Sequence, residues 1–151
     1  MKEIKPPATL PTKRIENQII FLAGSIEMGT AEHWQTEVAA YFKNRTDIIL
    51  LNPRREDWNT SWEQKIENPY FFEQVNWELT GLDTADKIIM YFSPNTKSPI
   101  SLLELGLYAS SGKLLVCCPE GFWRKGNVDI VCKRYGIPSY ENLDVLLQTN
   151  F

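Results

Sequence analysis

Glu104 is the residue of this sequence best placed to do chemistry. It lies in the segment 98–106 (SPISLLELG), which follows a β-type apolar run at 87–92 and a short polar loop. Ser98 can cap a helix, and Pro99 suits the first helical position, where its missing N–H costs nothing. Glu104 then falls in the second turn of a helix that starts past the carboxyl end of a strand, the edge where open parallel sheets bind ligands. There it would serve as a nucleophile or a base; the alternative is a plain surface glutamate.

Glu78 is the second candidate carboxylate. It lies at the border of the apolar face of a helix expected over 69–84, where a glutamate is most often a solvated flank. If Glu78 instead leans over the same edge as Glu104, two carboxylates stand near one reacting centre. Such a pair suits cleavage at an anomeric carbon, because one group attacks or stabilises the oxocarbenium-like centre while the other manages a proton.

The elements that must position these residues alternate between strands and helices. Strands are expected at 19–23, 48–51, 87–92 and 114–118, with a short one at Ile137, and helices at 30–43, 69–84, 98–111, 128–135 and 141–148. This order predicts a three-layer, flavodoxin- or Rossmann-like α/β fold, a parallel sheet of four to five strands with helices on both faces. Residues 1–17 are expected to form a flexible N-terminal arm, and 18–151 a single domain.

The loops that follow the strands then share one rim, which carries further candidates for binding. Gly24 allows close backbone approach, and amides at the turn that begins with Ser25 can hold an anion or a sugar hydroxyl. Asn52 follows the second strand, and Trp58 lies in a long polar loop at 54–68. A tryptophan ring can stack on a base, although packing is the more frequent role.

Composition narrows the classes of function. The chain has 151 residues, a net charge of −3 and a pI near 5.2, which argue against a nucleic-acid polymer or an acidic membrane as partner. We expect no metal or organic cofactor, since there is one histidine, the three cysteines are not clustered as zinc ligands, and no G-x-G-x-x-G or P-loop pattern occurs. With no signal peptide or membrane-length apolar run, we expect a cytoplasmic protein with reduced thiols.

Several segments together resemble the nucleoside 2-deoxyribosyltransferase superfamily, especially its small bacterial branch of deoxyribosyltransferase-like proteins. The segments read FLAGSI at 21–26, LNPRR at 51–55 with Trp58, QVNWEL at 74–79, SPISLLELG at 98–106 and GNV at 126–128. They span most of the chain from residue 19 to about residue 135. The Glu-Leu-Gly segment with its preceding loop is the more specific part, and the glycine after the first strand is the less specific.

The resemblance assigns roles to particular residues. The family's nucleophile, the glutamate of a Glu-Leu-Gly segment, falls on Glu104, and its second acidic residue falls on Glu78, where an aspartate is usual. The asparagine that reaches into a neighbouring subunit's site falls on Asn127. Two positions depart from the pattern: Ile20 replaces a tyrosine, and Ser98 replaces an aspartate that binds the base in transferases. In related deoxynucleoside-monophosphate N-glycosidases a serine at the latter position contacts phosphate.

The resemblance implies an enzyme that cleaves or transfers at the N-glycosidic bond of 2′-deoxynucleosides through a deoxyribosyl-glutamate intermediate. A deoxynucleoside-5′-monophosphate N-glycosidase is the alternative, and a non-catalytic nucleotide-binding sensor is the alternative of another class. The expected partners are a small-molecule nucleoside or nucleotide and a free base. Because the Glu104 helix is apolar almost all round, it must be covered on more than one side, so we also expect a homo-oligomer, a dimer or higher.

Overall fold

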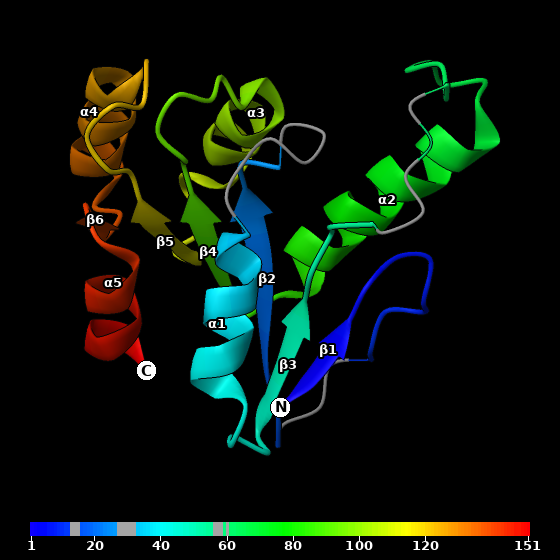
Figure 1. Cartoon of the computed structure of the whole chain (residues 1–151), viewed down its shortest axis with the longest axis horizontal. Helices are drawn as coiled ribbons and strands as arrows, with labels where there is room; N and C mark the ends of the chain where they lie inside the picture. Colours follow the sequence, from blue (N-terminus) through cyan, green and yellow to red (C-terminus); the bar gives the residue numbers. More distant parts are fainter. Residues whose placement is uncertain (13–15, 27–32, 56–58, 60) are drawn as a thin grey trace.

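One six-stranded parallel sheet organises the protein (Figure 1). The computed structural model describes residues 1–12, 16–26, 33–55, 59 and 61–151. The strands lie side by side in the order β1-β3-β2-β4-β5-β6, and every pair is parallel. Their bounds are β1 Lys2–Ile4, β2 Gln18–Gly24, β3 Ile48–Leu51, β4 Lys87–Tyr91, β5 Leu114–Cys117 and β6 Ser139–Tyr140.

The strand order confirms the predicted fold class. Counted from β2, the strands follow the order 2-1-3-4-5, which is that of flavodoxin-like sheets. The chain reverses its direction of winding between β2 and β4, and this switch point is where such sheets open a crevice for ligands. The two neighbours are paired from Ile20 with Lys87 to Gly24 with Tyr91. Their carboxyl ends therefore lie together at one rim.

Strand β1 is the sixth strand, and it lies where the sequence predicts a flexible arm. Lys2–Ile4 pairs with β3 at the edge of the sheet, and Asn52 N donates to Ile4 O at 2.9 Å. Further along, Trp77 Nε1 donates to Ala8 O at 2.7 Å. The start of the segment is therefore fastened to the sheet and to a helix. The sequence pattern misses this strand because three residues with a single buried side chain, Ile4, carry no alternation.

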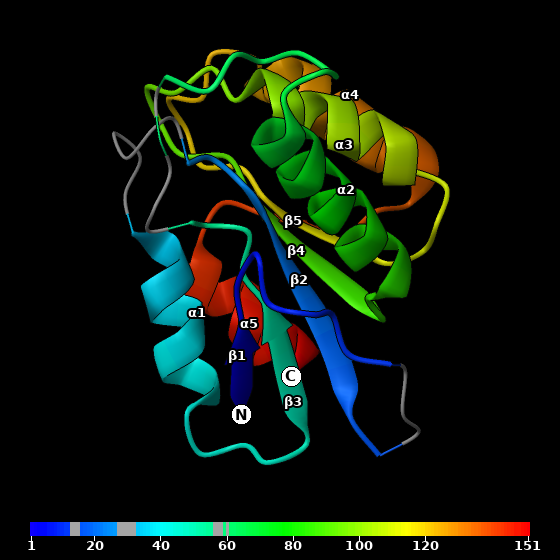
Figure 2. The same cartoon turned by 90° about the vertical axis from the view of Figure 1, so that its right-hand side faces the viewer.

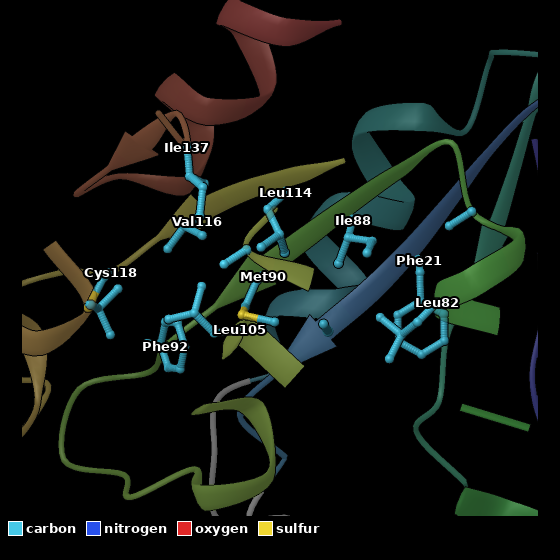
Figure 3. Close-up of a cluster of buried hydrophobic side chains, with 14 of the residues drawn as sticks. Phe21, Leu82, Ile88, Met90, Phe92, Leu105, Leu114, Val116, Cys118 and Ile137 are labelled. Carbon is cyan, nitrogen blue, oxygen red and sulfur yellow. The ribbon is translucent and has the colours of Figure 1, made fainter. Parts of the chain in front are cut away.

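Helices cover both faces of the sheet, as Figure 2 shows. The helices α1 Trp34–Phe42 and α5 Leu143–Asn150 pack on one face, and α2 Pro69–Thr84, α3 Pro99–Tyr108 and α4 Lys125–Tyr135 pack on the other. The period of two along β2 divides its side chains between the layers. Phe21 joins the core beneath α2, α3 and α4 (Figure 3), whereas Leu22 joins the core beneath α1 and α5.

Local signals fix where α2 begins, and α2 carries Glu78. Asn68 Oδ1 accepts hydrogen bonds from Tyr70 N and Phe71 N, each at 3.1 Å, and Pro69 occupies the first turn. These are the helix-start signals of the sequence, and the predicted bounds 69–84 are confirmed. Helix α4 begins at Lys125, three residues before its predicted start. None of the helices in the described residues is both long and apolar enough to cross a membrane.

Candidate active site

A cluster of buried hydroxyl groups lies where β2 and β4 end. Ser25 Oγ lies 2.6 Å from Ser98 Oγ and 3.0 Å from Thr96 Oγ1, and the latter two oxygens are 3.0 Å apart. Ser93 N donates to Ser25 Oγ at 2.9 Å, and Thr96 Oγ1 donates to Ser93 O at 2.8 Å. The cluster therefore ties the turn after β2 to the loop that leads into α3.

Gly24 allows β2 to end against β4. Its φ is +132°, and a Cβ at this position would lie 2.2 Å from Tyr91 O. Only a residue without a side chain fits such a close approach. Ser25 N then donates to the same Tyr91 O at 2.9 Å, and Trp34 Nε1 donates to Ser25 O at 3.0 Å. Gly24 and Ser25 thus form the tight end of β2 at the rim.

Ser98 occupies the position before α3, as the sequence predicts, but its hydroxyl does not cap the helix. The residue has a left-handed backbone (φ 44°, ψ 54°), and its side chain makes no capping hydrogen bond. The hydroxyl instead joins Ser25 and Thr96. The left-handed conformation turns the side chain into the hydroxyl cluster, which corrects the expected capping role.

Glu104 is buried, with 8% of its surface exposed. It lies one turn after Ser101, which is also buried, on the α3 side of the sheet. Burial first, and the nearby Glu78 charge second, raise the pKa of Glu104 to about 8. The Glu78 charge acts on Glu104, so the two predicted carboxyl groups lie within electrostatic reach of each other.

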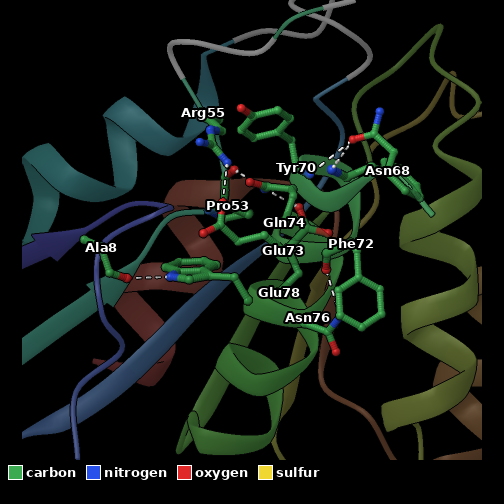
Figure 4. Close-up of polar contacts among 12 residues, drawn as sticks. Ala8, Pro53, Arg55, Asn68, Tyr70, Phe72, Glu73, Gln74, Asn76 and Glu78 are labelled. Carbon is green, nitrogen blue, oxygen red and sulfur yellow. Dashed lines mark hydrogen bonds and ion pairs between the residues drawn. The ribbon is translucent and has the colours of Figure 1, made fainter. Parts of the chain in front are cut away.

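Glu78, the second carboxyl group of the pair, lies on α2 and accepts a hydrogen bond from Gln74. Burial raises the pKa of Glu78, and the hydrogen bond from Gln74 lowers it, with burial the larger effect. Gln74 Nε2 donates to Glu78 Oε1 at 2.7 Å and to Pro53 O at 3.0 Å (Figure 4). The sequence hypothesis did not single out Gln74, although it lies one helical turn before Glu78 and so faces the same way.

Two arginines follow β3 beside these groups. The Arg55 side chain is 6% exposed; its Nη1 lies 3.6 Å from Glu73 Oε2, and its guanidinium lies 5.1 Å from the centre of the Trp62 ring. Arg54 has its Nη2 3.4 Å from His33 Nε2, while its Nη1 is buried with no hydrogen-bond partner in the described part of the chain.

The remaining predicted binding residues have different settings. Asn52 is buried, and its side chain is turned toward the edge strand β1: its Nδ2 donates to Glu3 Oε1 at 2.7 Å, and its Oδ1 accepts from Arg54 N at 3.0 Å. Asn127 lies in the first turn of α4 and is exposed. Trp58 lies outside the described residues. Asn52 thus shapes the loop that carries Arg54.

The arrangement can handle a proton and a bond at an electrophilic carbon. Burial and the interaction between the two carboxyl groups disfavour the state in which both are ionised. A pair of this kind supplies one acid and one base from the same residue type. Within residues 1–12, 16–26, 33–55, 59 and 61–151, no group of three or more histidines, cysteines and acidic residues could hold a metal ion.

Comparison with known proteins agrees with this geometry. A family model described as nucleoside 2-deoxyribosyltransferase like matches residues 17–122, which include both glutamates, the hydroxyl cluster and the arginine loop. A search of curated proteins finds no match. The family match covers more than half of the chain, and this protein belongs to the nucleoside 2-deoxyribosyltransferase-like family.

Proposed function

We propose that this protein is a glycosyl-transferring enzyme that cleaves the N-glycosidic bond of 2′-deoxynucleosides. The observation that carries the proposal is the buried Glu104 carboxyl group beside Glu78, at the switch point of a sheet whose family handles deoxyribosyl groups. No metal or organic cofactor enters the proposed chemistry. The hydroxyls of Ser25 and Ser98 would face the substrate's polar groups.

In the proposed reaction, ionised Glu104 attacks C1′ of the sugar. A bond forms between a Glu104 carboxylate oxygen and C1′, the C1′–N bond breaks, and the base leaves with the electron pair and takes up a proton. The resulting deoxyribosyl ester is resolved by a second base, which gives a new nucleoside, or by water, which gives free deoxyribose. Glu78 would orient the sugar or move the proton.

A chromatographic assay tests this proposal. Purified protein would be incubated with deoxynucleosides and deoxynucleoside monophosphates, each with and without a free acceptor base. A new nucleoside that forms only with acceptor supports transfer, and free base in both cases supports hydrolysis. Glu104→Ala should abolish turnover, whereas Glu120→Gln, which changes an exposed glutamate, should leave it intact. Full activity of the Glu104 variant would rule out its role as nucleophile.

Arg54 favours a second candidate, a deoxynucleoside-5′-monophosphate N-glycosidase. Its guanidinium has a buried, unpartnered Nη1 in the described part of the chain, and arginine suits phosphate because its donors form a fork. Arg54→Gln should then raise KM for monophosphates by tenfold or more and leave KM for nucleosides unchanged. Arg134→Gln, an exposed position on α4, is the control. Equal effects on both substrate types would argue against the phosphate contact.

A binding module without chemistry is the competing class. The glutamate at position 78 and the serine at position 98 stand where an aspartate is usual in the family, which is what a pocket that kept binding and lost turnover would show. A ligand-induced rise in melting temperature without any product in the same assay would support this sensor. Product from any substrate would exclude it.

A further inference from the structure

We propose that Gln74 is a positioning residue of the active site: it anchors the Glu78 side chain to the loop after β3 and favours the ionised form of Glu78. The inference rests on the proposed roles of the two glutamates. It goes beyond them because neither the family match nor the sequence pattern gives Gln74 a role.

The burial of Gln74 is the first observation. Its residue surface is 3% exposed, which is uncommon for glutamine. Figure 4 shows its side chain between the loop after β3 and Glu78. Its Nε2 donates to Pro53 O at 3.0 Å and to Glu78 Oε1 at 2.7 Å, whereas its Oε1 is buried with no hydrogen-bond partner among the described residues.

Pro53 decides which way the Gln74 amide faces. A backbone carbonyl only accepts hydrogen bonds, so the NH₂ group must turn toward it. The same NH₂ group then faces Glu78, whose oxygen must accept. An ionised carboxylate accepts such a hydrogen bond more strongly than a neutral carboxyl group does, so the hydrogen bond favours the charged form of Glu78. An ionised Glu78 would then be held ready to orient the sugar for attack by Glu104.

Among the described residues, charged groups on the neighbouring elements make other contacts. On α3, the Tyr108 hydroxyl donates to Asp83 Oδ1 of α2 at 2.6 Å. Burial and this hydrogen bond, with a smaller effect of the Glu104 charge, raise the pKa of Tyr108. From the loop after β3, Arg55 Nη1 pairs with Glu73 Oε2 at 3.6 Å. Gln74 is the group whose hydrogen bond opposes burial at Glu78. The charge state of Glu78 therefore depends on the Gln74 amide.

The test follows the side-chain carboxyl carbons of the glutamates by ¹³C NMR across pH, without substrate. In Gln74→Met, which keeps the length and removes the donor, the titration midpoint of Glu78 should rise by about one pH unit or more, the size expected for a hydrogen bond to a charged group. Asn76→Ala removes an amide that bonds to Phe72 O at 2.8 Å on the same helix, and it should change neither midpoint.

Two further results decide the inference. If Gln74→Met lacks a native amide spectrum, Gln74→Asn is measured instead: its side chain is too short to span both acceptors, so the same rise is expected. An unchanged Glu78 midpoint in a folded variant would overturn the positioning role. Because the titration needs no turnover, this failure differs from failure of the proposed function, which would be a lack of product with the unmodified protein.

Discussion

At the scale of single residues, the setting of Glu104 decides its chemistry. The sequence places this glutamate on a helix after a strand, and the structure adds that it is buried within reach of a second carboxyl group's charge. A sequence cannot report such burial, because it depends on how α2 and α3 pack against each other. For the same reason the sequence did not single out Gln74 or Thr96. Nor did it show that Asn52, expected at the substrate, bonds to Glu3.

The raised pKa of Glu104 predicts a pH-dependent cost to stability. A carboxyl group whose folded-state pKa lies above its unfolded value contributes stability at low pH and loses it as pH rises from about 4.5 to about 8. Glu104→Gln cannot ionise and escapes this loss. Calorimetry should therefore find the variant's melting temperature close to that of the unmodified protein at pH 5 and higher by several degrees at pH 8. A difference that is equal at the two pH values would contradict the raised pKa.

The same pKa predicts the pH dependence of turnover. The nucleophile must be ionised, and kcat/KM reports groups of the free enzyme. The rate should therefore rise with pH and level off only above about 8, rather than near the usual glutamate value of 4.5. An acid limb with its midpoint below pH 6 would argue against Glu104 as the attacking group in this environment.

At the scale of elements, sequence patterns predict the positions of strands and helices better than they predict the contacts between them. The bounds of α2 follow from Asn68 and Pro69, whose signals are local. Strand β1 depends on its pairing with β3, which is distant in the sequence, so local patterns did not show it. Ser98 does not cap α3 as expected for a related reason: its hydroxyl bonds to Ser25, which lies 73 positions away in the sequence.

The approach of β2 to β4 predicts a strong effect at one glycine. Gly24→Ala places a Cβ against Tyr91 O and requires a positive φ, so it should lower the free energy of unfolding by roughly 2–4 kcal/mol. Gly106→Ala is the matched control, because its Cβ meets nothing within 4 Å. That variant should be more stable by about 0.5–1 kcal/mol, the gain of alanine over glycine inside a helix. Urea denaturation measures both, and similar values would contradict the close approach.

At the scale of the whole molecule, an apolar stripe on α3 remains uncovered by the chain itself. Ile100, Leu103 and Leu107 are 60%, 59% and 59% exposed, although they share a helix with the buried Glu104. Asn127 is exposed on α4, which packs on the same face of the sheet. We propose that a second copy of the chain covers this stripe, in line with the homo-oligomer expected from the nearly all-apolar sequence of this helix. Exposed apolar patches of this kind mark interaction surfaces.

Disruption of the stripe should change the assembly. Leu103→Glu places a charge in the proposed interface, so light scattering should give the mass of one 17.5 kDa chain for the variant and at least twice that for the unmodified protein. Val145→Glu is the control, because Val145 is a 50% exposed apolar residue on α5, on the other face of the sheet. A monomeric, fully active unmodified protein would exclude the assembly.

Complementation tests whether a site is shared between two copies. If the partner's Asn127 completes the site of Glu104, Glu104→Gln and Asn127→Ala should each abolish or strongly reduce turnover alone. A mixed dimer of the two variants contains one site with both native residues, because one chain supplies Glu104 and the other supplies Asn127. Mixing them after dissociation and reassembly should therefore restore part of the activity, whereas Glu104→Gln mixed with Glu78→Gln should not, since both residues come from the same chain. Recovery in neither mixture, with mixed dimers verified by mass spectrometry, would place Asn127 outside the partner's site.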